Sequence, residues 1–227
     1  MSPDLIIFDC DGVLVDSEPL AMRVLVAAIA AQGITVTPED AYRDFLGRSL
    51  ASISASLHDN HGEPLGETAL KSMRTDLYAL YRQELRASPG LPEVLTKLDI
   101  PFCVASSSTP ERIHLSLELT GLLPWFAPHI YSATMVENGK PAPDLFLHAA
   151  AAMGAAPENC LVIEDSPAGV AAARSAGMQV FGYVGGGHAE PSGLRQSLAA
   201  LAPDLVFDDM HALPDRLRSL RTEMRAR

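Results

Sequence analysis

The sequence contains few cysteines, and their spacing excludes a disulfide-stabilised fold. Cys10, Cys103 and Cys160 are far apart, odd in number and form no Cys-x-x-Cys motif. Each lies in or beside an apolar stretch, which is typical of a cysteine buried as a small hydrophobic residue. We therefore expect three free thiols and a reducing, cytoplasmic environment.

An excess of basic residues is also absent. The 227 residues include 17 Lys and Arg against 28 Asp and Glu, which gives a formal net charge of −11 at pH 7. Proteins that bind nucleic acid or an anionic membrane need a basic surface, so we expect neither kind of partner. If the ligand is an anion, the positive potential that binds it must be built locally.

Long hydrophobic runs are missing as well. No apolar stretch approaches the roughly 18 to 20 residues that span a membrane, and the longest covers residues 24–31. The first residues, MSPD, place no basic segment ahead of an apolar one, so no signal peptide is expected. With 48% hydrophobic and 20% charged residues, the composition is that of a globular protein of one or two domains.

Short apolar runs recur along the chain and predict a parallel sheet. None of them alternates polar with apolar residues, which is typical of strands buried on both faces. Helical patterns lie between them, and Thr109-Pro110 and Ser166-Pro167 each place a capping hydroxyl before a proline suited to the first helical position. The order predicts a doubly wound, Rossmann-like α/β core. The expected strands cover residues 5–8, 102–105, 160–163, 179–181 and 205–207.

Residues 16–86 contain no strand-like run and predict an inserted all-helical domain. Amphipathic stretches cover residues 17–32, 38–45, 49–60 and 66–86. We therefore expect a core domain formed by residues 1–15 and 87–227 and a helical cap formed by residues 16–86. The hinges between them are expected near residues 13–16 and 87–90.

Polar residues follow the predicted strands at the points where the strands end. Asp9 and Asp11 follow the strand at residues 5–8, and Ser106-Ser107-Ser108 follows the strand at residues 102–105. Glu164-Asp165 follows the strand at residues 160–163. Lys140 lies between the latter two strands, in Lys-Pro-Ala-Pro-Asp. The carboxyl ends of parallel strands share one sheet edge, so these side chains should face one crevice. Asp-x-Asp-Gly alone would equally describe two solvated aspartates at a strand end.

Together these four segments resemble the four motifs of the haloacid dehalogenase-like hydrolase superfamily, in its phosphatase branch. The helical insert resembles the C1 cap of members of the β-phosphoglucomutase and phosphogluconate phosphatase kind. The resemblance implies a Mg²⁺-dependent phosphatase of a small phosphorylated metabolite, such as a sugar phosphate or sugar-acid phosphate. It implies an aspartyl-phosphate intermediate on Asp9, with Asp11 as general acid and base.

The resemblance also assigns the other site residues. Asp9, Asp11 through its backbone carbonyl, Glu164 and Asp165 would hold Mg²⁺, although a structural role for Glu164 stays open. The Ser106 hydroxyl, the backbone near Ser107 and Lys140 would bind the phosphoryl group. The alternative for this serine segment is helix capping, for which Ser108 and Thr109 are the better candidates.

The cap offers one candidate substrate contact. Leu46-Gly47-Arg48-Ser49 resembles the family's specificity loop, so Arg48 is expected to reach an anionic substrate group; the alternative is an exposed arginine at a helix start. The seven histidines show no metal-ligand spacing and are interpreted as surface or cap residues, and Gly185-Gly186-Gly187 is interpreted as a loop.

Three alternative functions follow from the same motifs. In β-phosphoglucomutase relatives a histidine lies on the first cap helix, where this sequence has Ala21, which favours a hydrolase over a phosphomutase. A dehalogenase would lack Asp11 and the metal. A non-enzymatic module phosphorylated on Asp9 is disfavoured by the long helical insert, since such receivers are uncapped. The sequence leaves monomer and homodimer equally open.

Overall fold

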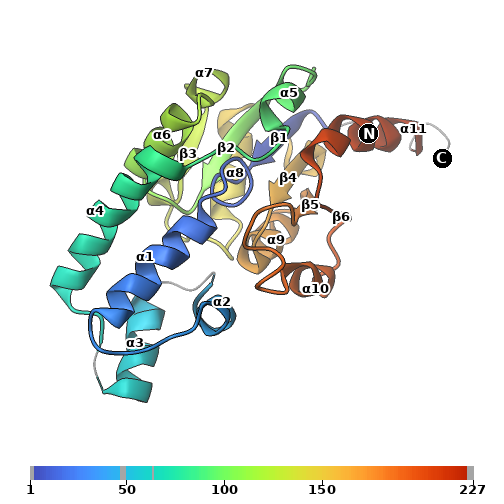
Figure 1. The fold of residues 1–227 in the computed structure, drawn as a ribbon. Coiled ribbons are helices and arrows are strands. Elements are labelled where there is room, and N and C mark those ends of the chain that lie inside the picture. Colours follow the sequence, from blue (N-terminus) through green and yellow to red (C-terminus); the bar gives the residue numbers. More distant parts are fainter. Residues whose placement is uncertain (1–2, 47–49, 63, 224–227) are drawn as a thin grey trace.

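The protein is built on a six-stranded parallel sheet with helices on both faces (Figure 1), as the computed structural model of residues 3–46, 50–62 and 64–223 shows. The strand order is β3-β2-β1-β4-β5-β6. β2 and β3 lie on one side of β1 and β4 to β6 lie on the other, so the order in which strands are added reverses at β1. This confirms the predicted doubly wound α/β class. The strands are β1 (Leu5–Phe8), β2 (Phe102–Ser106), β3 (Ile130–Ser132), β4 (Cys160–Glu164), β5 (Gln179–Tyr183) and β6 (Leu205–Phe207).

The central strands are apolar throughout because both of their faces are covered. Every residue of β1 is buried, and Ile7 pairs with Cys103 of β2 on one side and with Val162 of β4 on the other. Ile6 and Phe8 pack into one hydrophobic cluster, whereas Leu5 and Ile7 pack into the cluster on the opposite face. The lack of polar alternation in the sequence therefore reports burial on two sides.

Two layers of helices provide this cover. One cluster includes residues of α5 (Leu91–Leu95), α6 (Pro110–Leu119), α7 (Leu123–Phe126) and α11 (Leu213–Glu223). The other includes residues of α8 (Asp144–Ala152), α9 (Pro167–Ser175) and α10 (Leu194–Ala199). The predicted caps of α6 and α9 are confirmed, since Thr109 accepts from Arg112 N and Ser166 accepts from Gly169 N. Short 3₁₀ turns cover Ala133–Met135, Pro157–Asn159 and Met210–Ala212.

One strand was absent from the prediction. β3 has three residues and lies at the edge of the sheet, where β2 is its one neighbour among the described strands. Ile130 and Ser132 are buried while Tyr131 is partly exposed. A run this short gives no periodic signal, because two or three residues fit several local structures equally well.

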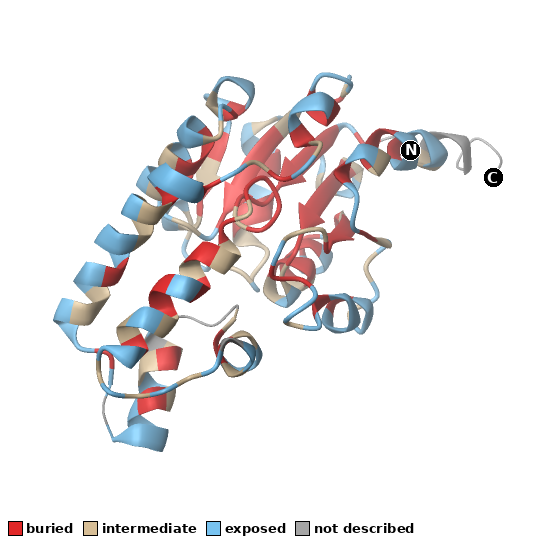
Figure 2. Ribbon diagram, in the orientation of Figure 1, coloured by how far each residue is buried: buried red, intermediate tan, exposed pale blue. Residues whose placement is uncertain are grey.

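Four of the five helices that the structure describes between β1 and β2 form a layer beside one end of the sheet (Figure 1). They are α1 (Glu18–Ala30), α2 (Pro38–Phe45), α3 (Leu50–His61) and α4 (Glu67–Glu84), and each falls within a predicted helical stretch or within one residue of it. Their facing sides are buried (Figure 2) in a third hydrophobic cluster that includes Leu25, Ile29, Phe45 and Leu57. Among the described residues, no helix combines the length and the apolarity needed to cross a membrane.

The two chain segments that connect these helices to the sheet lie side by side. Val15 pairs with Ala87 in an antiparallel bridge, and Asp16 N donates to Arg86 O at 3.1 Å. Ser88, which is buried, donates its hydroxyl to Val13 O at 2.5 Å. The chain thus enters and leaves the helical layer through two adjacent segments, and Leu20 of α1 and Tyr81 of α4 also pack into the core cluster on one face of the sheet.

Candidate active site

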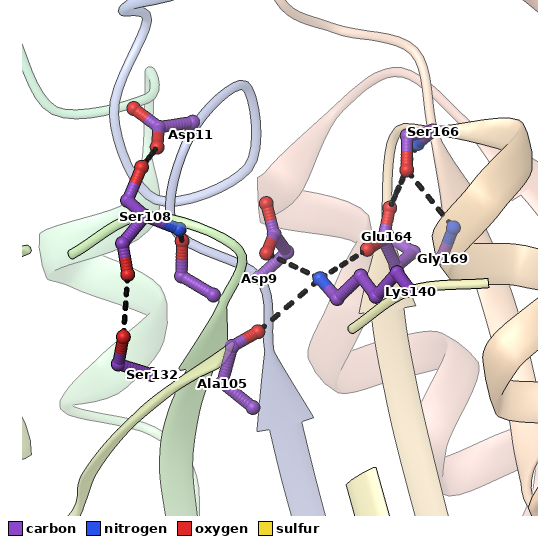
Figure 3. A network of polar contacts seen from close by, with 10 residues as sticks. Asp9, Asp11, Ala105, Ser108, Ser132, Lys140, Glu164, Ser166 and Gly169 are labelled. Carbon is purple, nitrogen blue, oxygen red and sulfur yellow. Dashed lines mark hydrogen bonds and ion pairs between the residues drawn. The ribbon is translucent and has the colours of Figure 1, made fainter. Parts of the chain in front are cut away.

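Asp9 occupies the position in the sheet where the strand order reverses. It follows β1 directly, between the end of β2 at Ser106 and the end of β4 at Glu164. In open α/β sheets the crevice at such a reversal is where ligands bind. Figure 3 shows that the predicted residues Asp9, Lys140 and Glu164 meet there.

Lys140 joins two buried carboxylates that come from different strands. Its Nζ lies 2.6 Å from Asp9 Oδ1, 2.6 Å from Glu164 Oε1 and 3.3 Å from Ala105 O. The side chain is 4% exposed and also lies 4.8 Å from the ring centroid of Phe146. Burial alone would lower the pKa of Lys140, but Asp9 and Glu164 raise it above its ordinary value. The site therefore contains a buried ammonium group that is charged at neutral pH.

Glu164 has a protein partner for each of its oxygens. While Oε1 accepts from Lys140, Oε2 accepts from the backbone N of Ser166 at 2.8 Å and from its hydroxyl at 3.0 Å. A Cβ at Gly169 would lie 1.8 Å from Oε1, so only glycine leaves room for this carboxylate beside α9. This arrangement favours the structural role for Glu164 over the metal-ligand role.

The Asp11 carboxylate is held by three side chains. Oδ1 accepts from the hydroxyl of Ser17 at 2.7 Å and from Arg112 Nη2 at 2.8 Å, and Oδ2 accepts from the hydroxyl of Ser108 at 2.5 Å. Burial alone would raise the pKa of Asp11, but Arg112, Ser108 and Ser17 together hold it below its ordinary value. Asp11 is thus ionised in this arrangement.

Arg112 connects this carboxylate to the helical layer. Its Nη2 also donates to the hydroxyl of Tyr81 on α4 at 2.8 Å, and its guanidinium lies 5.6 Å from the Tyr81 ring centroid. Sequence reasoning missed both Arg112 and Ser17. Ser17 follows the motif closely enough to have been a candidate, whereas nothing in the spacing of Arg112 on α6 distinguishes it from a surface arginine.

The residues of the serine segment at the end of β2 differ in their burial and in their hydrogen bonds. Ser106 is buried and its hydroxyl accepts from Ser108 N at 3.1 Å, while Ser107 is exposed at the strand end. Thr109, and not Ser108, caps α6. Ser132 of β3 donates to Ser108 O at 2.7 Å, which fixes the backbone of this segment beside Asp11.

Asp165 contacts His188, for which the sequence predicts a surface or cap position. Its Oδ2 lies 3.0 Å from His188 Nε2, and His188 is 2% exposed and lies outside residues 16–86, so that prediction is wrong. The reason is the loop after β5, which turns back over the sheet edge; a single histidine in a glycine-rich loop carries no signal of that path. The predicted substrate contact Arg48 lies outside the described residues.

The electrostatics of the crevice favour a bound cation. Asp9, Glu164 and Asp165 are all buried, and within the described part of the chain Lys140 is the only lysine or arginine paired with any of them. Burial, together with repulsion from neighbouring carboxylates, raises the pKa of Asp9 and of Asp165 well above the ordinary value. Oxygen donors with such a deficit of positive charge suit a hard divalent ion. No three His, Cys, Asp or Glu side chains among the described residues converge closely enough to enclose a metal by themselves.

Known proteins are similar to this chain in sequence and in fold. Residues 3–177 match the haloacid dehalogenase-like hydrolase family. The chain is 33% identical to 6-phosphogluconate phosphatase of Escherichia coli (strain K12) over 189 residues, which cover 83% of this chain and 86% of that protein.

Two solved structures are similar over nearly their whole length. A haloacid dehalogenase-like protein of Agrobacterium tumefaciens str. C58 has a TM-score of 0.88 and 35% identity, covering 96% of this chain and 99% of that one. A HAD family hydrolase of Deinococcus radiodurans R1, solved with bound phosphate and sodium, has a TM-score of 0.79 and 32% identity, covering 98% and 97%. The match to the family over most of the sequence, on the same sheet, means that this chain belongs to the haloacid dehalogenase-like hydrolases, in their phosphatase branch.

Proposed function

We propose that the protein is a Mg²⁺-dependent phosphatase that hydrolyses a small phosphorylated metabolite through an aspartyl-phosphate on Asp9. The observation that carries this proposal is the buried Lys140, which bonds Asp9 Oδ1 and leaves the second oxygen of that carboxylate without a bond to it. A carboxylate needs a nearby positive charge to approach a phosphate dianion, and the lysine supplies part of it.

The metal-binding residues follow from the donor set. The carboxylates of Asp9 and Asp165 and the backbone carbonyl of Asp11 would hold Mg²⁺, and water would fill the remaining positions. When bound, the cation supplies positive charge that offsets the repulsion between Asp9 and the phosphoryl group. The Asp11 carboxylate is bonded to Ser17, Ser108 and Arg112 and is assigned to proton transfer, not to the metal.

The chain's own residues account for both chemical steps. An oxygen of Asp9 forms a bond to phosphorus as the bond from phosphorus to the ester oxygen breaks, and the leaving oxygen takes a proton from Asp11. Asp11 must therefore leave Arg112 and carry a proton when the substrate is bound. In the second step Asp11 takes a proton from water, whose oxygen attacks phosphorus and frees Asp9 and inorganic phosphate. Lys140, Ser106 and the backbone N–H groups near Ser107 hold the phosphoryl oxygens.

Helices α1 to α4 are proposed to form the cap, residues 16–86, that closes over this crevice. The two adjacent segments at Val15 and Ala87 are the proposed hinge, and Tyr81 of α4 contacts Arg112 beside Asp11, so opening the cap would break this contact. Closure would exclude water during the first step and bring Arg48 to an anionic part of the substrate. We place the enzyme in the cytoplasm, in keeping with its three free, buried thiols.

The substrate class is proposed from the relatives. The E. coli relative is named for 6-phosphogluconate, a sugar-acid phosphate, and the D. radiodurans relative was solved with bound phosphate and sodium. The name of the first supports a phosphorylated carbohydrate or its acid as substrate, and the phosphate bound by the second supports a phosphate ester more generally. We favour hydrolysis over phosphomutase chemistry because α1 carries Ala21, a methyl group, where a mutase places a histidine.

Phosphate release from a panel of sugar phosphates and sugar-acid phosphates, with Mg²⁺ and with excess chelator, tests the proposal. We expect hydrolysis of at least one of them, an activity at least about 100-fold lower in chelator, and recovery when Mg²⁺ is restored. Activity that persists in excess chelator would contradict the metal assignment. With a sugar 1-phosphate and a bisphosphate primer, an isomerised product in place of free phosphate would identify a mutase. A stable phosphoprotein without turnover would identify a signalling module.

A further inference from the structure

We infer that His188 is a positioning residue that holds the carboxylate of Asp165 in the orientation needed to bind the cation. The inference rests on the proposed Mg²⁺-dependent function and adds to it a residue from outside the four motifs. His188 lies in the loop that follows β5, and it contacts the carboxylate rather than the substrate.

The contact is buried and leaves the imidazole a single polar partner. Nε2 of His188 lies 3.0 Å from Asp165 Oδ2, and the two side chains are 2% and 8% exposed. Nδ1 has no hydrogen-bond partner among the described residues. An ionised carboxylate only accepts hydrogen bonds, so a neutral His188 with its proton on Nε2 fits this pair, and Nδ1 is then a lone acceptor. The imidazole thus has one polar function here, donation to Asp165.

Two glycines from separate loops make room for the pair. A Cβ on Gly12 would lie 1.8 Å from Asp165 Oδ2 and 3.0 Å from His188 Cε1. A Cβ on Gly186 would lie 2.8 Å from the same ring carbon and from Nδ1. Gly12 also has a φ of +79°, which disfavours any other residue. The last position of Asp-x-Asp-Gly is therefore shaped around Asp165 and His188 together.

The backbone around His188 is fixed on both sides. Gly187 N donates to Asp16 Oδ1 at 2.9 Å, which ties the loop to the connection leading into α1. On the other side, Ser192 donates its hydroxyl to His188 O at 2.7 Å. A ring held by its own backbone contacts fixes its partner more firmly than a ring on a free loop would.

The expected consequence is on metal affinity. The contact of His188 with Oδ2 restricts rotation of the Asp165 carboxylate, which would hold it in one orientation toward a cation. Hydrogen bonds to a metal-binding carboxylate typically contribute about 10-fold to 100-fold to affinity. Without this hydrogen bond the Asp165 carboxylate can rotate. Its loss of rotational freedom on binding the cation then reduces the affinity.

Direct Mg²⁺ binding by titration calorimetry, with unfolding temperatures in chelator, tests this on three variants of the full chain. His188→Leu fills a similar volume without a donor, His188→Gln places an amide N–H near the position of Nε2, and His148→Leu removes an exposed imidazole on α8 as a control. We expect the Kd for Mg²⁺ to rise about 10-fold to 100-fold in His188→Leu. In His188→Gln most of the parent affinity should be restored, and His148→Leu should bind Mg²⁺ as the parent protein does.

Equal Mg²⁺ affinity in His188→Leu and the parent protein would overturn the inference. So would glutamine and leucine variants that are equally weak, because that pattern reports packing instead of a hydrogen bond. If the leucine variant fails to fold, His188→Asn, whose side chain is too short to reach Asp165, should show the same rise in Kd. A parent protein that binds no Mg²⁺ contradicts the proposed function itself, and with it this inference.

Discussion

Replacing Asp9 with asparagine should reduce phosphate release by at least about 10⁴-fold while the protein stays folded. The amide keeps the shape of the side chain, and its oxygen still accepts from Lys140, which lies 2.6 Å from Asp9 Oδ1 in the parent protein. It removes the nucleophilic oxygen that the proposed reaction needs. Since the pKa of Asp9 is raised by burial, the neutral amide should leave the unfolding temperature unchanged or higher.

Hydrolysis of an aryl phosphate and thermal unfolding provide the two readouts. Asp215→Asn, which alters an exposed carboxylate on α11, is the matched control and should keep full activity. Near-parental turnover by the Asp9 variant would remove Asp9 as nucleophile. A loss of activity accompanied by a lower unfolding temperature would show instead that the carboxylate has a structural role.

Lys140→Met should be both inactive and unstable. Methionine keeps an apolar stem beside Phe146 but leaves Asp9 and Glu164 buried with no cation between them. Breaking such a buried pair costs about 3 to 5 kcal/mol of unfolding free energy. Loss of the charge should also lower turnover by roughly 10²-fold to 10³-fold.

The pH dependence of this loss has a definite sign. In the parent protein the pKa of Lys140 is raised by folding. Its contribution to the free energy of unfolding is therefore complete below its ordinary pKa of 10.5 and is lost only at higher pH. Without Lys140 the folded pKa of Asp9, already raised, moves further up. A carboxylate with a raised folded pKa loses stability as pH rises from its unfolded value of about 4. The difference in the free energy of unfolding between the parent protein and Lys140→Met should therefore increase from pH 5 to pH 8.

Urea unfolding at these two pH values measures the difference in the free energy of unfolding. Lys97→Met, which replaces an exposed lysine after α5, controls for the loss of a lysine. A variant as stable as the parent at both pH values would contradict the buried charge pair. A difference that decreases as pH rises would contradict the assignment of the carboxylates as its cause.

The fold and the motif residues could be predicted because their signals are local. Strands buried on two faces read as continuous apolar runs, and Asp9, Ser106 and Glu164 end or follow three of them directly. Parallel pairing then brings those ends to one edge. The helical stretch was visible because amphipathic periods replace the strand pattern.

The remaining contacts depend on the paths of loops and on side-chain rotamers, which leave no local pattern. His188 reaches Asp165 only because the loop after β5 folds back, and Arg112 reaches Asp11 from a helix 101 positions away. Lys140 lies in a loop between β3 and α8 and not at a strand end, so its role was assigned from the resemblance. That Asp11 faces Ser17 and Arg112 also followed from no motif, since spacing fixes neighbours along the chain but not the direction of a carboxylate.

The measurement that tests the central claim most directly is the mass of an Asp11→Asn variant incubated with an aryl phosphate and Mg²⁺. An aryl leaving group needs little protonation, so the first step should proceed, while hydrolysis of the intermediate should be slow without the base. The account predicts one equivalent of phenol released rapidly and a protein heavier by one phosphoryl group, mapped to Asp9. Continued release of phenol from a protein that is never modified, or a phosphoryl group on a different residue, would contradict it.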